Sequence, residues 1–161
     1  MECNFFGPGS VVWDLKSTDK FEAIRELVHA APIYRSIPSF DVGDFANRVV
    51  TREYEQSTGF GHGIAISHGR TEQVSRSVVS LGISRNGIDF DSVDGEPVHT
   101  LFVVATHPEH HVDYLRVLST LAYVARDPRF HDNILTCVCI EEVERRLSVA
   151  LSRVLRRRWV A

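Results

Sequence analysis

Residues 57–69 of this chain read STGFGHGIAISHG, and this stretch decides how the rest of the sequence is interpreted. Its first half is rich in glycine and predicts a tight turn. The apolar run Ile64 to Ile66 then predicts a strand, and His68 falls at its end. Gly69 follows, and glycine allows close approach of the backbone to a ligand. The stretch therefore predicts a histidine at the end of a strand.

On both sides of this strand the sequence alternates between helix and strand patterns. We expect further strands at residues 11–15, 77–83, 100–106 and 135–140, and a loop at 86–97. We expect helices after Asp19, over about 40–56, after Thr106, and over about 141–157. Because strands and helices are interspersed, we expect an α/β (α+β) fold, a mixed β-sheet flanked by helices.

Two pairs of residues predict helix starts. Asp19 with Glu22 and Thr106 with Glu109 have the spacing of a capping box, and Pro108 is tolerated in a first turn. We expect the helix after the second pair to bury a face made of Leu115, Leu118, Ala122 and Ala125.

The three cysteines, Cys3, Cys137 and Cys139, do not have the spacing of a disulfide framework. On the expected strand 135–140, Cys137 and Cys139 would point to one face. Buried thiols in a core strand are the favoured interpretation, ahead of a metal or redox pair.

Composition indicates an ordinary globular protein in one domain, residues 1–161, with 43% hydrophobic and 24% charged residues. No stretch approaches the roughly 20 apolar residues of a membrane span, and no signal peptide is recognised, so we expect a cytoplasmic protein. The net charge of −3 argues against nucleic-acid binding. The local run Arg153, Arg156, Arg157 and Arg158 suits the negative end of a helix dipole.

Histidines form a second cluster at His107, His110 and His111. Imidazoles three or four residues apart on a helix share a face and can bind a metal. No carboxylate or cysteine completes a zinc spacing, so we predict no metal site. No role is assigned to His29, His99 and His131.

Arg48 and Arg52 are one helical turn apart in the expected helix 40–56. Two guanidinium groups on one face suit a phosphate, which arginine can hold through two hydrogen bonds. A solvated helix face is an equally good interpretation for Arg48.

The order of the segments resembles a known family. Thr51-Arg52-Glu53, then Ser57-Thr58-Gly59-Phe60-Gly61, then residues 63–69 resemble the signature "Arg-Glu, a Ser-Thr-Gly turn, and Gly-Ile-Ala-Ile-Pro-His". This is the signature of fructose/mannitol-type enzyme IIA proteins (type-2 EIIA) of the bacterial phosphotransferase systems for sugar and nitrogen regulation. Downstream, residues 87–90, 94–95, 97–98 and 101–105 also match, so the resemblance covers about residues 11–155.

The resemblance implies the mannitol-type IIA fold and a phosphoryl carrier. His68 would accept a phosphoryl group from phosphorylated HPr or its nitrogen-system relative, and Arg52 would neutralise the phosphoryl oxygens. The group would pass to a IIB component, or its presence would regulate a partner. The resemblance implies no metal and no cofactor.

The chain departs from the family pattern at two positions. Ser67 replaces the proline before the active histidine, and its hydroxyl is a candidate to bond a phosphoryl oxygen. Tyr114 stands where the family has a second histidine, and a phenol donates a hydrogen bond but carries no positive charge. We expect Tyr114 to take the supporting role, with His111 as the backup.

Four functions are considered, in order of preference. A nitrogen-regulatory IIA is favoured because we expect a stand-alone domain, with no IIB or membrane segment among these residues, and because the second histidine is altered. A IIA component of fructose/mannitol-type sugar uptake is the alternative. A protein-binding regulator that has lost phosphotransfer is a third, and a metal-dependent enzyme built on the histidine cluster ranks last.

Overall fold

A five-stranded mixed sheet forms the centre of the computed structural model, which describes residues 3–159. The strands are β1 (Val11–Val12), β2 (Gly59–Gly61), β3 (Ile64–Arg70), β4 (Val78–Ile88) and β5 (Val98–Thr106), in the order β1-β4-β5-β3-β2. Strand β5 pairs parallel with β3 and antiparallel with β4. The mixed sheet flanked by helices that the sequence predicts is confirmed.

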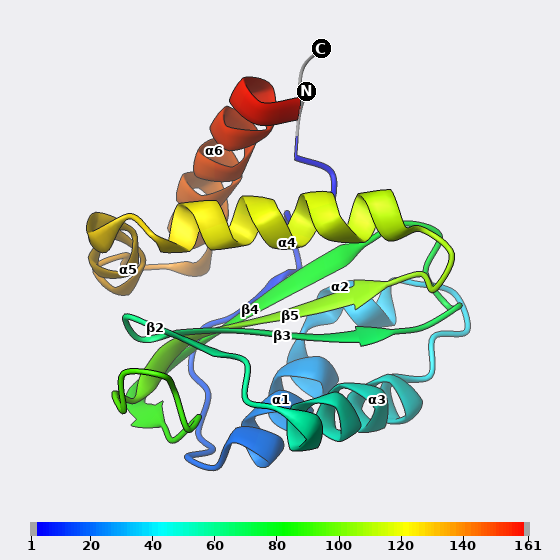
Figure 1. Cartoon of the computed structure of the whole chain (residues 1–161), viewed down its shortest axis with the longest axis horizontal. Helices are drawn as coiled ribbons and strands as arrows, with labels where there is room; N and C mark the ends of the chain where they lie inside the picture. Colours follow the sequence, from blue (N-terminus) through cyan, green and yellow to red (C-terminus); the bar gives the residue numbers. More distant parts are fainter. Residues whose placement is uncertain (1–2, 160–161) are drawn as a thin grey trace.

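Helices cover both faces of this sheet (Figure 1). One face carries α1 (Lys20–Ala30), α2 (Pro32–Arg35) and α3 (Val42–Glu55), and the other carries α4 (His111–Ala125), α5 (Pro128–Leu135) and α6 (Ile140–Trp159). Helix α4 lies across its face of the sheet, and α6 packs beyond it (Figure 1). Within residues 3–159, no helix has the length and apolar character needed to cross a membrane.

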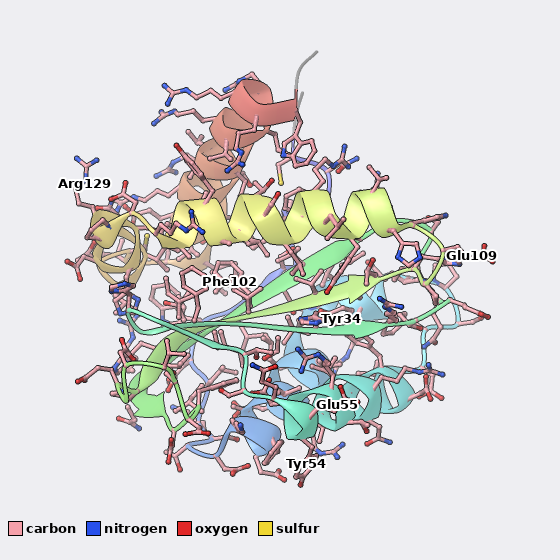
Figure 2. All side chains as sticks on the ribbon, in the orientation of Figure 1. Tyr34, Tyr54, Glu55, Phe102, Glu109 and Arg129 are labelled. Atoms are coloured by element: carbon pink, nitrogen blue, oxygen red, sulfur yellow. The ribbon has the colours of Figure 1, made fainter. Side chains whose placement is uncertain are left out.

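The side chains of β5 explain why helices must pack on both faces of the sheet. All of its side chains except that of His99 are buried. Val103 and Ala105 pack toward α1 and α3, whereas Phe102 and Val104 pack toward α4 and α6. Figure 2 shows Phe102 on the α4 side of the sheet. An almost continuous apolar run of this kind is stable only in a strand covered on both sides.

The two predicted helix starts have opposite outcomes. The Asp19 carboxylate accepts hydrogen bonds from the backbone N–H groups of Phe21 and Glu22, which confirms it as the cap of α1. The second start was wrong. Thr106 is the last residue of β5 and pairs with Arg70, so the sheet holds it in an extended conformation. Helix α4 begins only at His111, and its cap makes no side-chain hydrogen bond.

The buried face of α4 also differs from the prediction. The buried residues are Val117, Thr120, Leu121, Val124 and Ala125. Of the predicted face only Ala125 is buried, and Leu115 has 59% of its surface exposed. Helix α4 has apolar side chains on more than one face, so the spacing alone did not determine which face meets the sheet.

The predicted strand 135–140 was wrong. Helix α5 occupies the chain up to Leu135, and α6 begins at Ile140. The Asp127 carboxylate caps α5 through the N–H of Arg129, and Pro128 is its first residue. Between the helices Cys137 is buried and Cys139 is exposed, so the two thiols do not share a core face.

Other boundaries moved by a few residues. The first strand contains only Val11 and Val12, although the N–H of Leu15 still donates to the Ile83 carbonyl at 2.7 Å. Strand β4 continues to Ile88, into the predicted loop. The last helix was predicted correctly, and it buries Val143, Leu147, Leu151 and Val154.

Gly82 gives a test of this packing. A Cβ at Gly82 of β4 would lie 2.4 Å from Cδ1 of the buried Leu15. We expect Gly82→Ala to lower the free energy of unfolding by about 1–3 kcal/mol, because the core must expand around the new methyl group. Urea unfolding followed by circular dichroism measures the change. Gly7→Ala is the control, since a Cβ at Gly7 meets no atom within 4 Å. An equal loss in both variants would contradict this account.

Candidate functional site

His68 lies on the outer part of the sheet. Its strand β3 pairs with β5 along its whole length, with His68 opposite Val104. On the other side, β2 pairs only with Ile64 and Ala65. Among the residues that the structure describes, no strand therefore covers the outer edge of β3 at His68. The imidazole is half-buried, so solvent or a partner can reach it.

Two further side chains gather beside His68 on the α4 face of the sheet. The ring of Tyr114, from the first turn of α4, has its centroid 5.8 Å from that of His68. Arg70 follows His68 by two residues, so the alternation of a strand directs it to the same face. Its guanidinium carbon lies 5.9 Å from the Tyr114 ring centroid. The structure thus groups an imidazole, a phenol and a guanidinium.

The surroundings of His68 favour a neutral ring. Its pKa is lowered first by burial, which disfavours the charged form, and then by the positive charge of Arg52. Arg70 lowers it further, while the backbone of Ile66 and the Glu53 carboxylate partly oppose these effects. The ring is therefore more often uncharged at neutral pH than an unperturbed histidine.

The two ring nitrogens of His68 differ. Nδ1 is buried and, within residues 3–159, has no hydrogen-bond partner of good geometry. The backbone of Ile66 nevertheless acts on the ring, because it raises the pKa of His68 against the effect of burial. Because Nδ1 is buried while the side chain as a whole is only half-buried, we infer that Nε2 is the ring nitrogen that a partner can reach.

Arg52 lies in the last turn of α3 and is half-buried. Its Nη1 donates to the Gln56 carbonyl at 3.2 Å, and its charge reaches His68. Arg48, one turn earlier, donates to the Asp44 carboxylate at 2.8 Å instead. Of the two arginines considered from the sequence, Arg52 is the one that acts on His68.

Ser67 belongs to the opposite face of the sheet. It is 1% exposed, and its Oγ lies 2.8 Å from the Oγ1 of Thr58. Thr58 in turn donates through its N–H and hydroxyl to the buried carboxylate of Glu53, which Lys20 approaches at 3.3 Å. The expectation that the Ser67 hydroxyl bonds a phosphoryl oxygen does not agree with this geometry. Ser67 instead ties β3 to the turn before it.

The histidines at the start of α4 stand apart from this group. His111 is the first residue of the helix and is exposed. The rings of His107 and His110 stack on each other, with centroids 4.4 Å apart. Within the described part of the chain, no group of three or more histidine, cysteine, aspartate or glutamate side chains could hold a metal ion.

Sequence reasoning missed Arg70. The period of a strand contained the signal, because a residue two positions after His68 must share its face. The shared face alone does not mark Arg70 as a site residue. The contact with Tyr114 does, and only the packing of α4 on the sheet reveals that contact.

Comparison with known proteins gives one family. The family model described as "Phosphoenolpyruvate-dependent sugar phosphotransferase system, EIIA 2" matches residues 4–149. The fructose-specific EIIABC component of Bacillus subtilis is 36% identical over 109 residues, which are 68% of this chain and 17% of that protein. The nitrogen regulatory protein of Pseudomonas aeruginosa is 30% identical over 117 residues, 71% of this chain and 75% of that protein.

The chain therefore spans a minor part of some relatives and most of others. The fructose-specific EIIA component of Haloferax volcanii is 39% identical over 74 residues, which are 46% of this chain and 48% of that protein. Among solved structures, IIA-Ntr of Neisseria meningitidis has a TM-score of 0.79 at 24% identity, covering 91% of this chain and 96% of that one. IIA mannitol of Escherichia coli has a TM-score of 0.69 at 19% identity, covering 86% and 95%. At these identities the structures confirm the fold.

The electrostatic role of Arg52 is testable by NMR. We expect Arg52→Gln to raise the pKa of His68 toward its ordinary value, because a nearby positive charge is removed. Titration of the imidazole signals by ¹H–¹⁵N spectroscopy measures it. Arg48→Gln is the matched control and should leave the pKa unchanged. Equal shifts in both variants, or none in Arg52→Gln, would contradict the assignment.

The lowered pKa of His68 also has a consequence for stability. The unfolded chain binds this proton at higher pH than the folded chain. The contribution of His68 is therefore fully present above about pH 6.5 and is lost as the pH falls through the folded-state pKa.

Proposed function

We propose that this chain, which belongs to the EIIA 2 family of the phosphoenolpyruvate-dependent sugar phosphotransferase system, carries a phosphoryl group on His68. The observation that carries the proposal is the half-buried imidazole, with its pKa lowered by burial and by Arg52, on the open edge of β3. A histidine accepts a phosphoryl group only through a neutral ring nitrogen with a free lone pair.

Nε2 of His68 is the proposed acceptor atom. With a proton on the buried Nδ1, the lone pair of Nε2 faces solvent. A new bond forms between this lone pair and phosphorus while the P–N bond of the donor's phosphohistidine breaks. The electrons of the broken bond stay with the donor imidazole, and the proton on Nδ1 does not move.

Positive charge would stabilise the transferred group. Phosphoryl transfer passes through a loose transition state, so positioning and neutralisation of the oxygens supply most of the catalysis. Arg52 would act from the end of α3 and Arg70 from β3. Arg70 also compensates for Tyr114, whose phenol can donate a hydrogen bond but cannot be a cation. His111 is exposed at the start of α4 and is the backup to Tyr114.

The proposed donor is phosphorylated HPr or its nitrogen-system relative, and the proposed acceptor is a IIB component or a regulated protein. We favour the nitrogen-regulatory role, because Tyr114 replaces the second histidine of the family and the Pseudomonas aeruginosa nitrogen regulatory protein aligns with 71% of this chain. The sugar-uptake role is the alternative within the family. Such a carrier would work in the cytoplasm, without metal or cofactor and without nucleic acid.

A second candidate function is a protein-binding regulator that no longer carries phosphate. The substitutions at Ser67 and Tyr114 favour it, because each replaces a residue of the family signature. The two functions differ in whether the purified chain becomes phosphorylated, which is directly measurable.

The first test is phosphorylation in a reconstituted relay. Incubation with radiolabelled phosphoenolpyruvate, enzyme I and HPr, or their nitrogen-system counterparts, should give an acid-labile phosphate on the wild-type chain. We expect His68→Ala to abolish labelling and His99→Ala to retain it, since His99 donates from Nδ1 to the Ser84 carbonyl, far along β4 and β5 from His68. Labelling of His68→Ala would remove the assignment, and an unlabelled wild type would favour the regulator.

The second test concerns Tyr114. We expect Tyr114→Phe to slow phosphorylation of His68 about tenfold, because a hydrogen bond to a charged group contributes about 1.5–3 kcal/mol. His111→Ala should have a smaller effect, as that side chain is exposed. Quenched-flow kinetics of labelling measures both. Wild-type rates in both variants would eliminate the supporting role for either residue.

A further inference from the structure

A groove of about 1000 Å³ lies between the C-terminal half of α4, helix α5 and helix α6. Figure 1 shows these segments together, at the opposite end of α4 from its first turn. Tyr114 contacts His68 near the start of α4, whereas Tyr123 lines the groove about 13 Å farther along the helix. The groove is therefore separate from the phosphoryl site.

Arginine dominates the sides of this groove. The arginines that line it are Arg129, Arg145, Arg146, Arg153, Arg157 and Arg158, against a single lining carboxylate, that of Asp127. Asp127 pairs with Arg129, which Figure 2 shows at the α5 end of the molecule, and Glu142 pairs with Arg146. In a chain of net charge −3, this is a local concentration of positive charge.

Three of these arginines form no close ion pair in the described part of the chain, although the charge of Arg145 helps to lower the pKa of Glu142. Within residues 3–159, no ion pair involves Arg145, Arg153 or Arg157, and all three are exposed on α6. Arg158 instead lies over the ring of Tyr123, 5.1 Å from its centroid. Like charges gathered around a concave, low-dielectric surface focus the field and attract an anionic ligand. The helix-dipole role expected from sequence accounts only for the arginines of the last turn.

The floor of the groove is apolar. Val124, Phe130, Ile134 and Val154 are buried beneath it. Between the arginines, Tyr123 and Val149 remain 47% and 49% exposed. Exposed tyrosine and aliphatic carbon surrounded by arginine is the composition of protein–protein interfaces.

The shape and chemistry of the groove favour a helix as its occupant. A free phosphate is far smaller than the groove, and a nucleotide base would find few neutral polar side chains, namely Asn133 and the hydroxyl of Tyr123. From Arg145 to Arg157, α6 rises about 18 Å, which is about three turns of an opposing helix. Carboxylates one turn apart on that helix would meet guanidinium groups that bind them through paired hydrogen bonds.

We propose that this arginine groove binds an acidic amphipathic helix of a partner protein. The apolar stripe of that helix enters the floor between α5 and α6, and its carboxylates pair with Arg145, Arg153 and Arg157. Such helix-in-groove recognition uses apolar anchors at i, i+3, i+4 and i+7. The surface is independent of His68, so a partner can occupy it whether or not the phosphoryl site is loaded.

A synthetic peptide tests the groove on the full chain. The probe is a fluorescein-labelled helix of about 16 residues with leucine at the anchor positions and glutamate on both flanks. We expect saturable 1:1 binding by anisotropy, weakening with added salt, and ¹H–¹⁵N shift changes at Phe130, Ile134 and Val154. The double variant Arg153→Glu/Arg157→Glu should weaken binding at least tenfold. Arg76→Glu, an exposed charge reversal before β4, should leave it unchanged.

Two further measurements complete the experiment. A peptide of the same charge with serine in place of leucine should bind at least tenfold more weakly, since it lacks the anchors. The double variant should accept phosphate on His68 at the wild-type rate, which separates this site from the relay. The proposal is overturned by equal binding of the serine peptide, by absence of saturable binding, or by tighter binding of ATP or a single-stranded RNA.

Discussion

The parallel pairing of β3 with β5 is the constraint on which the site depends. It runs in one unbroken register from Ile64 opposite Thr100 to Arg70 opposite Thr106. This register fixes which face each side chain of β3 occupies. His68 and Arg70 must point toward α4, while Ser67 must point toward α3. A slip of one residue would exchange the two sets and bury the histidine beneath α3.

Burial and the two nearby guanidinium groups lower the pKa of His68 together, against the smaller opposing effects of Ile66 and Glu53. Burial alone favours the neutral ring, and the guanidinium groups of Arg52 and Arg70 strengthen that preference. The same positive charges that lower the pKa of His68 would attract the negatively charged oxygens of a phosphoryl group. A site of this kind needs few groups, since the chemistry lies in the phosphohistidine donor and the protein supplies position and charge.

Helix α4 connects the two surfaces proposed to have functions. Its first turn brings Tyr114 to His68, and its last turns bring Tyr123 and Val124 to the arginine groove. Its middle buries Val117 and Leu121 against the sheet, so both ends are held by one packed core. The chain is acidic overall, yet positive charge gathers at both ends of this helix, where an anionic group would approach.

Local sequence determined the elements whose signals are local. The run 64–68 specified a strand that carries a histidine, Asp19 specified the cap of α1, and the apolar spacing of 143–154 specified α6. The segment 135–140 lacked such a signal, because a short apolar run fits a strand, a helix end or a turn equally well. Only the tertiary structure decided that segment, the buried face of α4, and the meeting of His68, Tyr114 and Arg70. Each depends on which distant surfaces pack together, and no window of sequence contains that information.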